Sequence, residues 1–333
     1  MFIHERPEFA AVLRAAAAAS PLQDEALVEK DYWVTHALWA LSRTDLAFWF
    51  KGGTSLSKAF RLTHRFSEDL DLVVAPGGIT GLPTVSSWRS TSKSATASRR
   101  AYWEAIAPHL VIPDVAVALR ASDDENYCNP PFRARYPGLH VQSLSGPESV
   151  VTPFILLELA NAGAHAAVAP SVRRPISSFL HEFLETQDAF VGADAIADNR
   201  PTAIECVHPV VTLIEKLDAI TRRYARPEET FAPASFARHY EDAARIILAL
   251  ERDELPPLPQ TVAQVAAHLL ADGHIRKRVD AGDPALCLPD APRRLQIGRA
   301  YEALNAMFWE AQMPLAEAQA IIVRWLERCP FAG

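Results

Sequence analysis

Apolar residues repeat with a helical period near the start of the chain and with a strand period soon afterwards. Residues 6–42 predict two helices, the second starting near Gln23, because apolar side chains recur there at roughly helical spacing. The run 46–50 is short, apolar and aromatic, and it predicts a strand. Residues 67–74 alternate between polar and apolar before becoming wholly apolar, and they predict a second strand that ends at Pro76.

Three further apolar runs predict strands of a mixed sheet, at residues 115–119, 140–144 and 154–159. Residues 84–100 are rich in serine, threonine, arginine and lysine, which predicts a mobile loop over the site rather than a folded element. Residues 123–131 predict a polar turn region.

The helical period dominates from Pro209 to the end of the sequence. We therefore predict an α+β fold in which a mixed sheet with flanking helices precedes a helical domain. The predicted first domain is 1–205, with its N-terminal helices at 6–42 and its sheet at 46–160. The predicted helical domain is 206–333.

Composition narrows the class of protein without naming a function. The chain has 333 residues, of which 49% are hydrophobic and 22% charged, as in ordinary globular proteins with room for two cores. A net charge of -7 excludes a surface that is basic all over, but it leaves room for a local basic groove. Four widely spaced cysteines favour a reducing, cytoplasmic setting, and the apolar runs 15–19 and 151–170 are too interrupted by polar residues to predict a signal or membrane segment.

The candidate chemistry lies in "FKGGTSLSKAFRLTHRFSEDLDLVV", residues 50–74. Asp69 and Asp71 are two apart on a predicted strand, so they share a face with Cα atoms about 7 Å apart, close enough to bind one or two Mg²⁺ ions. The turn at Gly52 and Gly53 leads into a helix whose free N–H groups suit a polyphosphate. The alternative is a solvated edge strand beside a plain turn, but the strand–turn–helix–strand order favours a site for a metal and a triphosphate.

These segments resemble a known family. "VEKDYWV", "FKGGTSLSKAF" and "RFSEDLDL" are similar to the AbiEii-type nucleotidyltransferases, and "TLIEKLDAITRR" and "RHYEDAARI" extend the resemblance over residues 28–246. The family comprises the toxins of type IV toxin–antitoxin and abortive-infection systems, with a DNA polymerase β-like nucleotidyltransferase fold. The resemblance implies a nucleoside triphosphate substrate, Mg²⁺ or Mn²⁺ as cofactor, and an operon-encoded antitoxin as partner.

Site residues carried over from the family match single positions of this sequence. The resemblance implies that Asp69 and Asp71 are metal ligands, that Lys216 binds phosphate, and that Asp242 is a further active-site acid, the last two supplied by the helical domain. Taken alone, Lys216 is more often a lysine that reaches past an apolar stripe to water, and the phosphate role rests on the family resemblance. Asp242 is equally a partner for Arg238, and its neighbour Glu241 is an equally plausible acid.

For several nearby residues the sequence is consistent with two different roles. Glu158, in the apolar run "FILLELA", is either a third carboxylate that orients or deprotonates the acceptor hydroxyl or a charge at an exposed strand end. Ser67 either bonds phosphate or a metal-bound water, or simply begins a strand. Lys58 either reaches phosphate or is solvated, and residues 29–31 are predicted to brace the glycine turn through ion pairs. The residues expected to bind the nucleotide are Gly52, Gly53, Thr54, Ser55, Ser67 and Lys216.

The acceptor is predicted to be RNA, tRNA in particular. Basic residues are frequent where a groove is expected: Arg89, Lys93, Arg99, Arg100, Arg133, Arg135, Arg222, Arg223 and Arg226. Such patches are often plain solvated surface, so an enzyme of the same fold acting on a small molecule, such as an antibiotic, stays open. A non-catalytic nucleotide-binding protein is a third reading, which the retained aspartates and lysine disfavour.

Overall fold

The computed structural model describes residues 1–120, 126–145, 151–161 and 170–328. The chain forms two compact units. Within the described residues the first unit takes in 1–59, the described parts of 66–161, and 173–206, and the second takes in 60–65, 170–172 and 207–328. The connection at 60–65 therefore belongs to a different unit from the elements on either side of it.

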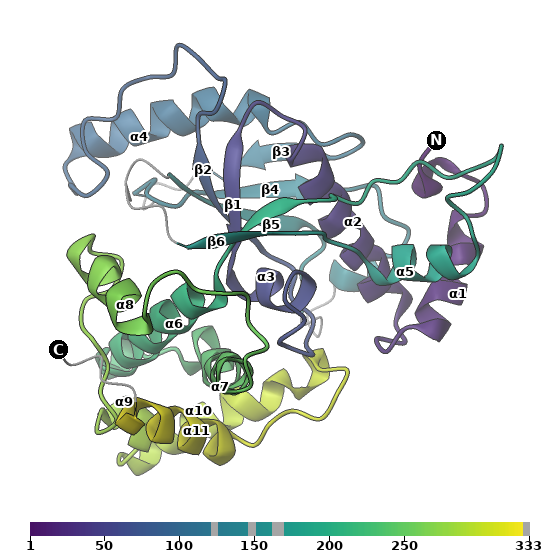
Figure 1. Cartoon of the computed structure of the whole chain (residues 1–333). Coiled ribbons are helices and arrows are strands. Elements are labelled where there is room, and N and C mark those ends of the chain that lie inside the picture. Colours follow the sequence, from purple (N-terminus) through teal and green to yellow (C-terminus); the bar gives the residue numbers. More distant parts are fainter. Residues whose placement is uncertain (121–125, 146–150, 162–169, 329–333) are drawn as a thin grey trace. The chain divides into compact units, whose positions relative to one another are not determined.

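A mixed sheet forms the core of the first unit (Figure 1), and it runs in the order β3-β4-β5-β2-β1-β7-β6. The strands are β1 (Ala47–Lys51), β2 (Leu70–Ala75), β3 (Ala116–Leu119), β4 (Pro131–Arg135), β5 (Ile155–Asn161), β6 (Ser171–Arg174) and β7 (Ile204–Val207). Strand β2 pairs with β1 antiparallel and with β5 parallel, so it lies in the interior of the sheet. The unit boundary falls inside β6 and β7.

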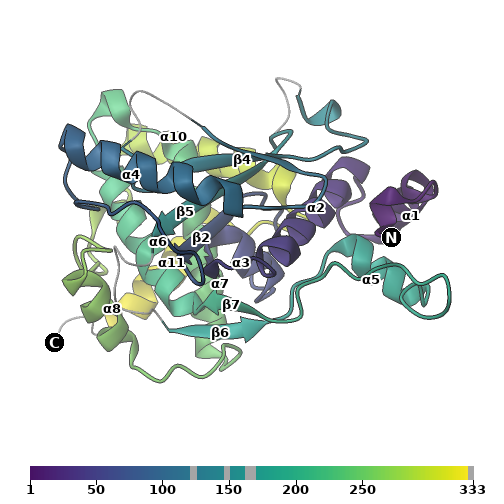
Figure 2. The ribbon, with the colours of Figure 1, turned by 90° about the horizontal axis from the view of Figure 1, so that it is seen from above.

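The helices of the first unit are α1 (Phe9–Ala19), α2 (Glu25–Leu41), α3 (Gly52–Lys58), α4 (Lys93–Ile106) and α5 (Phe179–Thr186). In Figures 1 and 2, α3 and α4 lie on opposite sides of the sheet. Trp103 of α4 packs against Phe132 of β4, with ring centroids 6.4 Å apart, and Tyr102 accepts a hydrogen bond from Asn161 of β5 at 2.7 Å. Helix α4 therefore covers the sheet face that carries the buried strand residues.

Helix α2 is buried over most of its length, together with its polar residues. Asp24 caps its start by accepting a hydrogen bond from the Leu27 N–H at 3.0 Å, and every residue from Val28 to Leu38 is buried. It packs against α1, α5 and β5. Because a buried polar group without a partner costs free energy, each charged residue of α2 needs a specific partner.

A network of neutral histidines links α2 to the segments around it. His36 donates from Nε2 to the Pro113 carbonyl at 3.1 Å, so its Nδ1 accepts from Asn199 at 2.8 Å. Asn199 also donates to the Tyr32 hydroxyl at 3.0 Å, and its carbonyl oxygen accepts from His181 at 2.8 Å. Burial lowers the pKa of His36 to about 4 and that of His181 to about 3, so both rings stay neutral at physiological pH.

The second unit is helical. It contains α6 (Pro209–Tyr224), α7 (Arg238–Glu251), α8 (Val262–Ala271), α9 (Pro284–Cys287), α10 (Ala291–Glu302) and α11 (Leu315–Arg328), and α7 packs between α6 and α11. Short 3-10 helices complete the chain at Ile3–Glu5, Ala107–His109, Ser143–Ser145, Glu228–Thr230, Pro233–Ser235 and Ala303–Met307. Within the described residues, every helix is too short or too polar to cross a membrane.

The predicted fold class is confirmed, and so are both N-terminal helices and the strands near 46–50, 115–119 and 154–159. The strand predicted at 67–74 begins at Leu70. The loop predicted at 84–100 is wrong beyond residue 92. There α4 starts, because Ser92 accepts a hydrogen bond from the Ala95 N–H at 3.3 Å and an aromatic face at Tyr102 follows.

The strand predicted at 140–144 is also wrong. The Glu29 carboxylate accepts the backbone N–H groups of Leu139 and His140 at 2.7 and 2.8 Å, and Ser143–Ser145 turns into a 3-10 helix. The strand beside β5 is instead β4, which the sequence concealed because it starts with a proline and carries two arginines. Strands β6 and β7 and helix α5 were not predicted, and part of the turn predicted at 123–131 lies outside the described residues.

Candidate active site

A glycine turn joins β1 to α3. Helix α3 starts at Gly52, whose φ of +78° lies in the left-handed region that glycine adopts freely, and Gly53 is its second residue. A Cβ added to Gly52 would lie 1.8 Å from Oδ2 of Asp71, where real side chains never approach. The Asp71 carboxylate therefore lies against the backbone of the turn, in space that any other residue at position 52 would fill.

Charged side chains form a row across three adjacent strands. Asp71 of β2 is the register partner of Lys51 in β1 and of Glu158 in β5. Such partners point to the same face of a sheet. The alternate residues Leu70 and Leu72 are buried on the other face, the one that α4 covers. The structure therefore brings Asp71 and Glu158 together on the face opposite α4, and Glu158 is exposed there in the middle of its strand rather than at its end.

Asp69 lies immediately before β2, where hydroxyl groups hold its backbone. The Thr54 hydroxyl bonds to the Asp69 carbonyl at 2.5 Å and to the Ser67 hydroxyl at 2.9 Å. Ser55 is buried, and its hydroxyl oxygen has no hydrogen-bond partner among the described residues; the Cys206 thiol is buried as well. Burial raises the pKa of that thiol to about 12. Thr54 and Ser67 thus help to fix the turn and the segment that follows it.

A buried ionic cluster occupies the second unit, between α6 and α7. Lys216 of α6 donates from Nζ to Oδ2 of Asp242 at 2.7 Å. Arg65 donates to both oxygens of the same carboxylate, from Nε to Oδ1 at 3.1 Å and from Nη2 to Oδ2 at 2.9 Å. All three side chains are buried. Both carboxylate oxygens of Asp242 are therefore occupied by cations of its own unit.

Burial and charge act in opposite directions on this cluster. Burial lowers the pKa of Lys216, and Asp242 partly opposes that shift while Arg65 adds to it. Burial also tends to raise the pKa of Asp242, but the charges of Arg65 and Lys216 outweigh it and hold this pKa well below its usual range. His239, 3.3 Å from Lys216 Nζ, has a pKa lowered well below its ordinary value by burial and by that neighbouring cation. With His239 neutral and Lys216 protonated, the cluster carries two positive charges and one negative.

Comparison with known proteins identifies the family. The model of the family described as nucleotidyl transferase AbiEii toxin of a type IV toxin–antitoxin system matches residues 36–319. The chain belongs to the AbiEii nucleotidyltransferase toxin family. This confirms the predicted enzyme class, and the family implies a nucleoside triphosphate substrate and an antitoxin partner.

Comparison with solved structures finds two distant similarities, and comparison with curated proteins finds none. MenT4, a nucleotidyltransferase toxin from Mycobacterium tuberculosis H37Rv, is 18% identical, with a TM-score of 0.37 over 88% of this chain and 98% of that one. An antigenic nucleotidyltransferase-like protein from Paracoccidioides brasiliensis is 15% identical, with a TM-score of 0.33 over 85% of this chain and 97% of that one. No curated protein matches the AbiEii-family chain.

Arg65 is the residue that the sequence analysis missed. It lies inside "RFSEDLDL", four residues before Asp69, but an arginine beside two acids is unremarkable in a sequence. Within the described residues the acid it pairs with, Asp242, is 177 positions away. The alternative pairing of Asp242 with Arg238 is wrong, because Arg65 and Lys216 take both oxygens.

Glu241, the alternative acid, has a packing role in this AbiEii-family chain. Its carboxylate accepts hydrogen bonds from the Tyr301 hydroxyl at 3.2 Å and from the Met313 N–H at 3.3 Å, and it pairs with Arg245 at 3.1 Å. Burial raises its pKa, although these partners oppose the shift. Glu241 therefore fastens the segments around α10 and α11 to α7.

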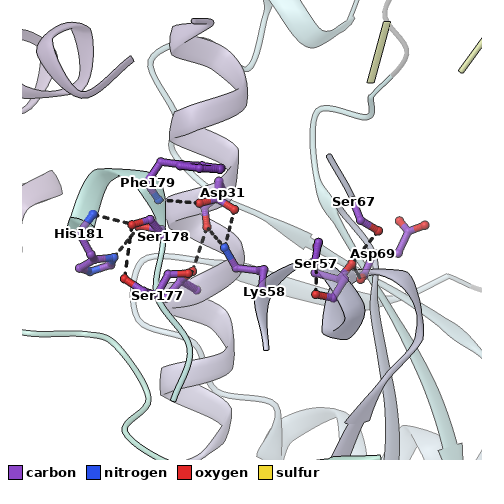
Figure 3. Close-up of polar contacts among 11 residues, drawn as sticks. Asp31, Ser57, Lys58, Ser67, Asp69, Ser177, Ser178, Phe179 and His181 are labelled. Atoms are coloured by element: carbon purple, nitrogen blue, oxygen red, sulfur yellow. Dashed lines mark hydrogen bonds and ion pairs between the residues drawn. The ribbon is translucent and has the colours of Figure 1, made fainter. Parts of the chain in front are cut away.

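Lys58 matches neither of its two interpretations. Its side chain is only 6% exposed and forms an ion pair with Asp31 of α2, whose second oxygen accepts the Phe179 N–H at 3.0 Å (Figure 3). The prediction that residues 29–31 act through ion pairs is confirmed at Asp31, which ties the end of α3 to α2, and at Lys30, which pairs with Glu68. The third residue, Glu29, binds backbone N–H groups instead.

The predicted basic surface needs a correction at Arg99. This side chain is 0% exposed, and its guanidinium donates to the carbonyl oxygens of Ser87, Ser90 and Asn126 at 2.6, 2.9 and 2.7 Å. Arg99 therefore fixes the segment before α4 and is closed to phosphate. The remaining basic residues are divided between the two units, and those exposed in the first unit are Arg89, Lys93, Arg100 and Arg135.

Among the described residues, one group of three potential metal ligands has its ligand atoms clustered, and it lies outside the aspartate row. Ligand atoms of His4, Glu5 and Asp114 lie within 4.8 Å of one another. The Tyr32 hydroxyl, which accepts a hydrogen bond from Asn199, donates its own proton to His4 Nδ1 at 2.5 Å. His4 then carries its proton on Nε2 and donates it to Asp114 at 3.2 Å. His4 is thus satisfied by these two hydrogen bonds as the end of the histidine network.

Proposed function

We propose that this AbiEii-family toxin transfers a nucleoside monophosphate from a nucleoside triphosphate to a hydroxyl group of RNA, with a tRNA end as the expected acceptor, and that it requires Mg²⁺ or Mn²⁺. The observation that carries the proposal is the contact between Gly52 and Asp71. It joins a turn suited to phosphate to the acidic row, so that one place offers both backbone donors and carboxylate ligands.

The carboxylates fit a divalent ion. Asp71 and Glu158 share one sheet face, Asp69 precedes Asp71 by two residues, and the absence of a Cβ at Gly52 makes room for the Asp71 carboxylate against the turn. Oxygen ligands of this kind are those that Mg²⁺ prefers. A bound ion would supply positive charge that stabilises the entering and leaving oxygens of the transfer. We assign Asp69 and Asp71 to holding it.

Other residues are assigned to binding the phosphates and to transferring the proton of the acceptor hydroxyl. The N–H groups of Gly52 and Gly53 are suited to the phosphates. The family motif assigns Lys216 of the second unit to phosphate as well, and we retain that assignment on the motif alone. Glu158 accepts the proton of the acceptor hydroxyl, whose oxygen attacks the α-phosphorus while pyrophosphate leaves. Asp242 has no free oxygen within its cluster, so we assign it to holding Lys216 and Arg65 rather than to acid–base chemistry.

RNA is favoured as the acceptor by the toxin family and by the exposed basic residues of the first unit. The test incubates the protein with each labelled nucleoside triphosphate and total cellular RNA, with Asp71→Asn as the inactive control. We expect label in RNA that depends on Asp71 and declines steeply between about 50 and 200 mM salt, as phosphate contacts require. Label in a small molecule, with a flat salt response, would contradict the RNA acceptor, and equal labelling by Asp71→Asn would contradict the site.

A further inference from the structure

Lys30 lies at the buried centre of α2 and has every donor of its ammonium group engaged. Its side chain is 0% exposed. It forms an ion pair with Glu68 and donates to the Thr152 carbonyl, and its third contact is the Thr152 hydroxyl at 3.2 Å. An ammonium group has three donors. Lys30 is therefore closed to substrate, and its charge acts on its own neighbours.

Those neighbours begin the two segments that carry the acidic row. Glu68 immediately precedes Asp69, and its carboxylate also accepts the Thr152 N–H at 2.8 Å. Thr152 lies three residues before β5, which carries Glu158, and its hydroxyl donates to the Phe154 carbonyl at 2.8 Å. One lysine thus ties the segment before β2 to the segment before β5.

Asp69 depends on such anchors because it lies outside the strand. Residues 66–69 precede β2 and lack the regular ladder that fixes Asp71. On one side the Thr54 hydroxyl holds the Asp69 carbonyl, and on the other side Glu68 is held by Lys30.

We propose that Lys30 is a positioning residue for Asp69, acting through Glu68 and Thr152 to set the divalent-cation affinity of the site. This inference rests on the proposed function, because it takes Asp69 and Asp71 as the ligands. Residues that orient metal ligands typically change metal affinity about 10–100-fold when they are mutated. Lys30 is expected to act in this range although it does not touch the ion.

The test measures Mn²⁺ binding directly, from the electron paramagnetic resonance signal of free Mn²⁺, in the presence of a non-hydrolysable nucleoside triphosphate analogue. Lys30→Met should weaken Mn²⁺ binding at least about tenfold. Glu29→Gln is the matched control, since Glu29 is the adjacent buried residue of α2 but binds the N–H groups of Leu139 and His140. It should leave Mn²⁺ affinity within about twofold of wild type, even where its thermal stability falls.

A double variant separates positioning from stability. Lys30→Met alone leaves the Glu68 carboxylate unpaired and destabilises the fold, whereas Lys30→Met with Glu68→Gln removes both charges and restores stability. We expect the double variant to recover its melting temperature and still to bind Mn²⁺ weakly. Recovery of Mn²⁺ affinity together with stability would overturn the inference, as would wild-type affinity in a folded Lys30→Met protein. If Asp71→Asn binds Mn²⁺ as well as wild type, the proposed site itself is wrong.

Discussion

Gly52→Ala should abolish nucleotide transfer and leave the fold standing. Position 52 has a φ of +78°, and an added Cβ would lie 1.8 Å from Asp71 Oδ2 and 2.7 Å from its Cγ. The substitution thus places a methyl group where the carboxylate is. Because that carboxylate is the end of a short side chain, it can rotate away, and the metal site is then lost while the sheet persists.

Two magnitudes follow from this geometry. Alanine in the left-handed region costs about 1–2 kcal/mol of stability. The methyl group and the oxygen must also move apart from 1.8 Å to at least 3.4 Å, the start of ordinary contact, which displaces the carboxylate by more than 1 Å. A displacement of about 1 Å in a catalytic group typically costs about 100-fold in rate, so we expect transfer to fall by at least that factor.

The assay compares Gly52→Ala with Gly81→Ala, for transfer of labelled nucleotide and for stability in urea. Gly81 has a nearly identical φ of +75°, but an added Cβ there meets nothing within 4 Å. The two variants should lose similar stability, and only Gly52→Ala should lose transfer. Near-normal transfer by Gly52→Ala, or an equal loss in Gly81→Ala, would refute the assignment of Asp71 to the site.

Three further predictions test other parts of the structure. Lys216→Ala should lower nucleotide transfer at least about 100-fold, and Lys216→Arg should restore it poorly, because a planar guanidinium group does not replace a compact ammonium group. Normal turnover together with a lower melting temperature would show that Lys216 has only a structural role. Lowering pH from 6.5 toward 4 should reduce the free energy of unfolding by about 3 kcal/mol through His36, because its pKa is lower in the folded protein and protonation therefore favours the unfolded state. In urea unfolding, His36→Gln should show a flatter pH dependence of stability. Arg99→Ala should cost about 3 kcal/mol or more by leaving buried carbonyls unpaired, against about 0.5 kcal/mol for the exposed Arg100→Ala, with urea midpoints as the measure.

The sequence could predict the parts of the site that depend on local geometry. The spacing of Asp69 and Asp71 and the two glycines before them determine a turn, a helix and a strand within about twenty residues. Their common sheet face then follows from the period of a strand. Glu158 could be proposed as a third carboxylate, but its register against Asp71 could not, because pairing between strands 87 positions apart depends on how the whole sheet assembles.

Long-range ionic partners were beyond the reach of sequence reasoning. Lys58 lies beside the glycine turn in the sequence, which suggested phosphate or solvent, but its partner Asp31 is on α2. Arg99 occurs in a run of polar residues that suggested an exposed loop, yet it is buried under carbonyl oxygens. In both cases the side-chain type was informative about charge, whereas burial was decided by tertiary packing.

The two aspartates Asp71 and Asp242 show why a carboxylate in a family motif does not define its own role. Asp71 is half-buried, and its carboxylate lies against Gly52, in the space that a Cβ there would fill. Asp242 is fully buried, and Arg65 and Lys216 already fill both of its oxygens. To bind a metal ion or take a proton, Asp242 would have to give up one of these cations and leave it buried without a counter-charge, which costs several kcal/mol. Its stable role is therefore to hold the cations, which is why we propose Asp69, Asp71 and Glu158, rather than Asp242, for the chemistry.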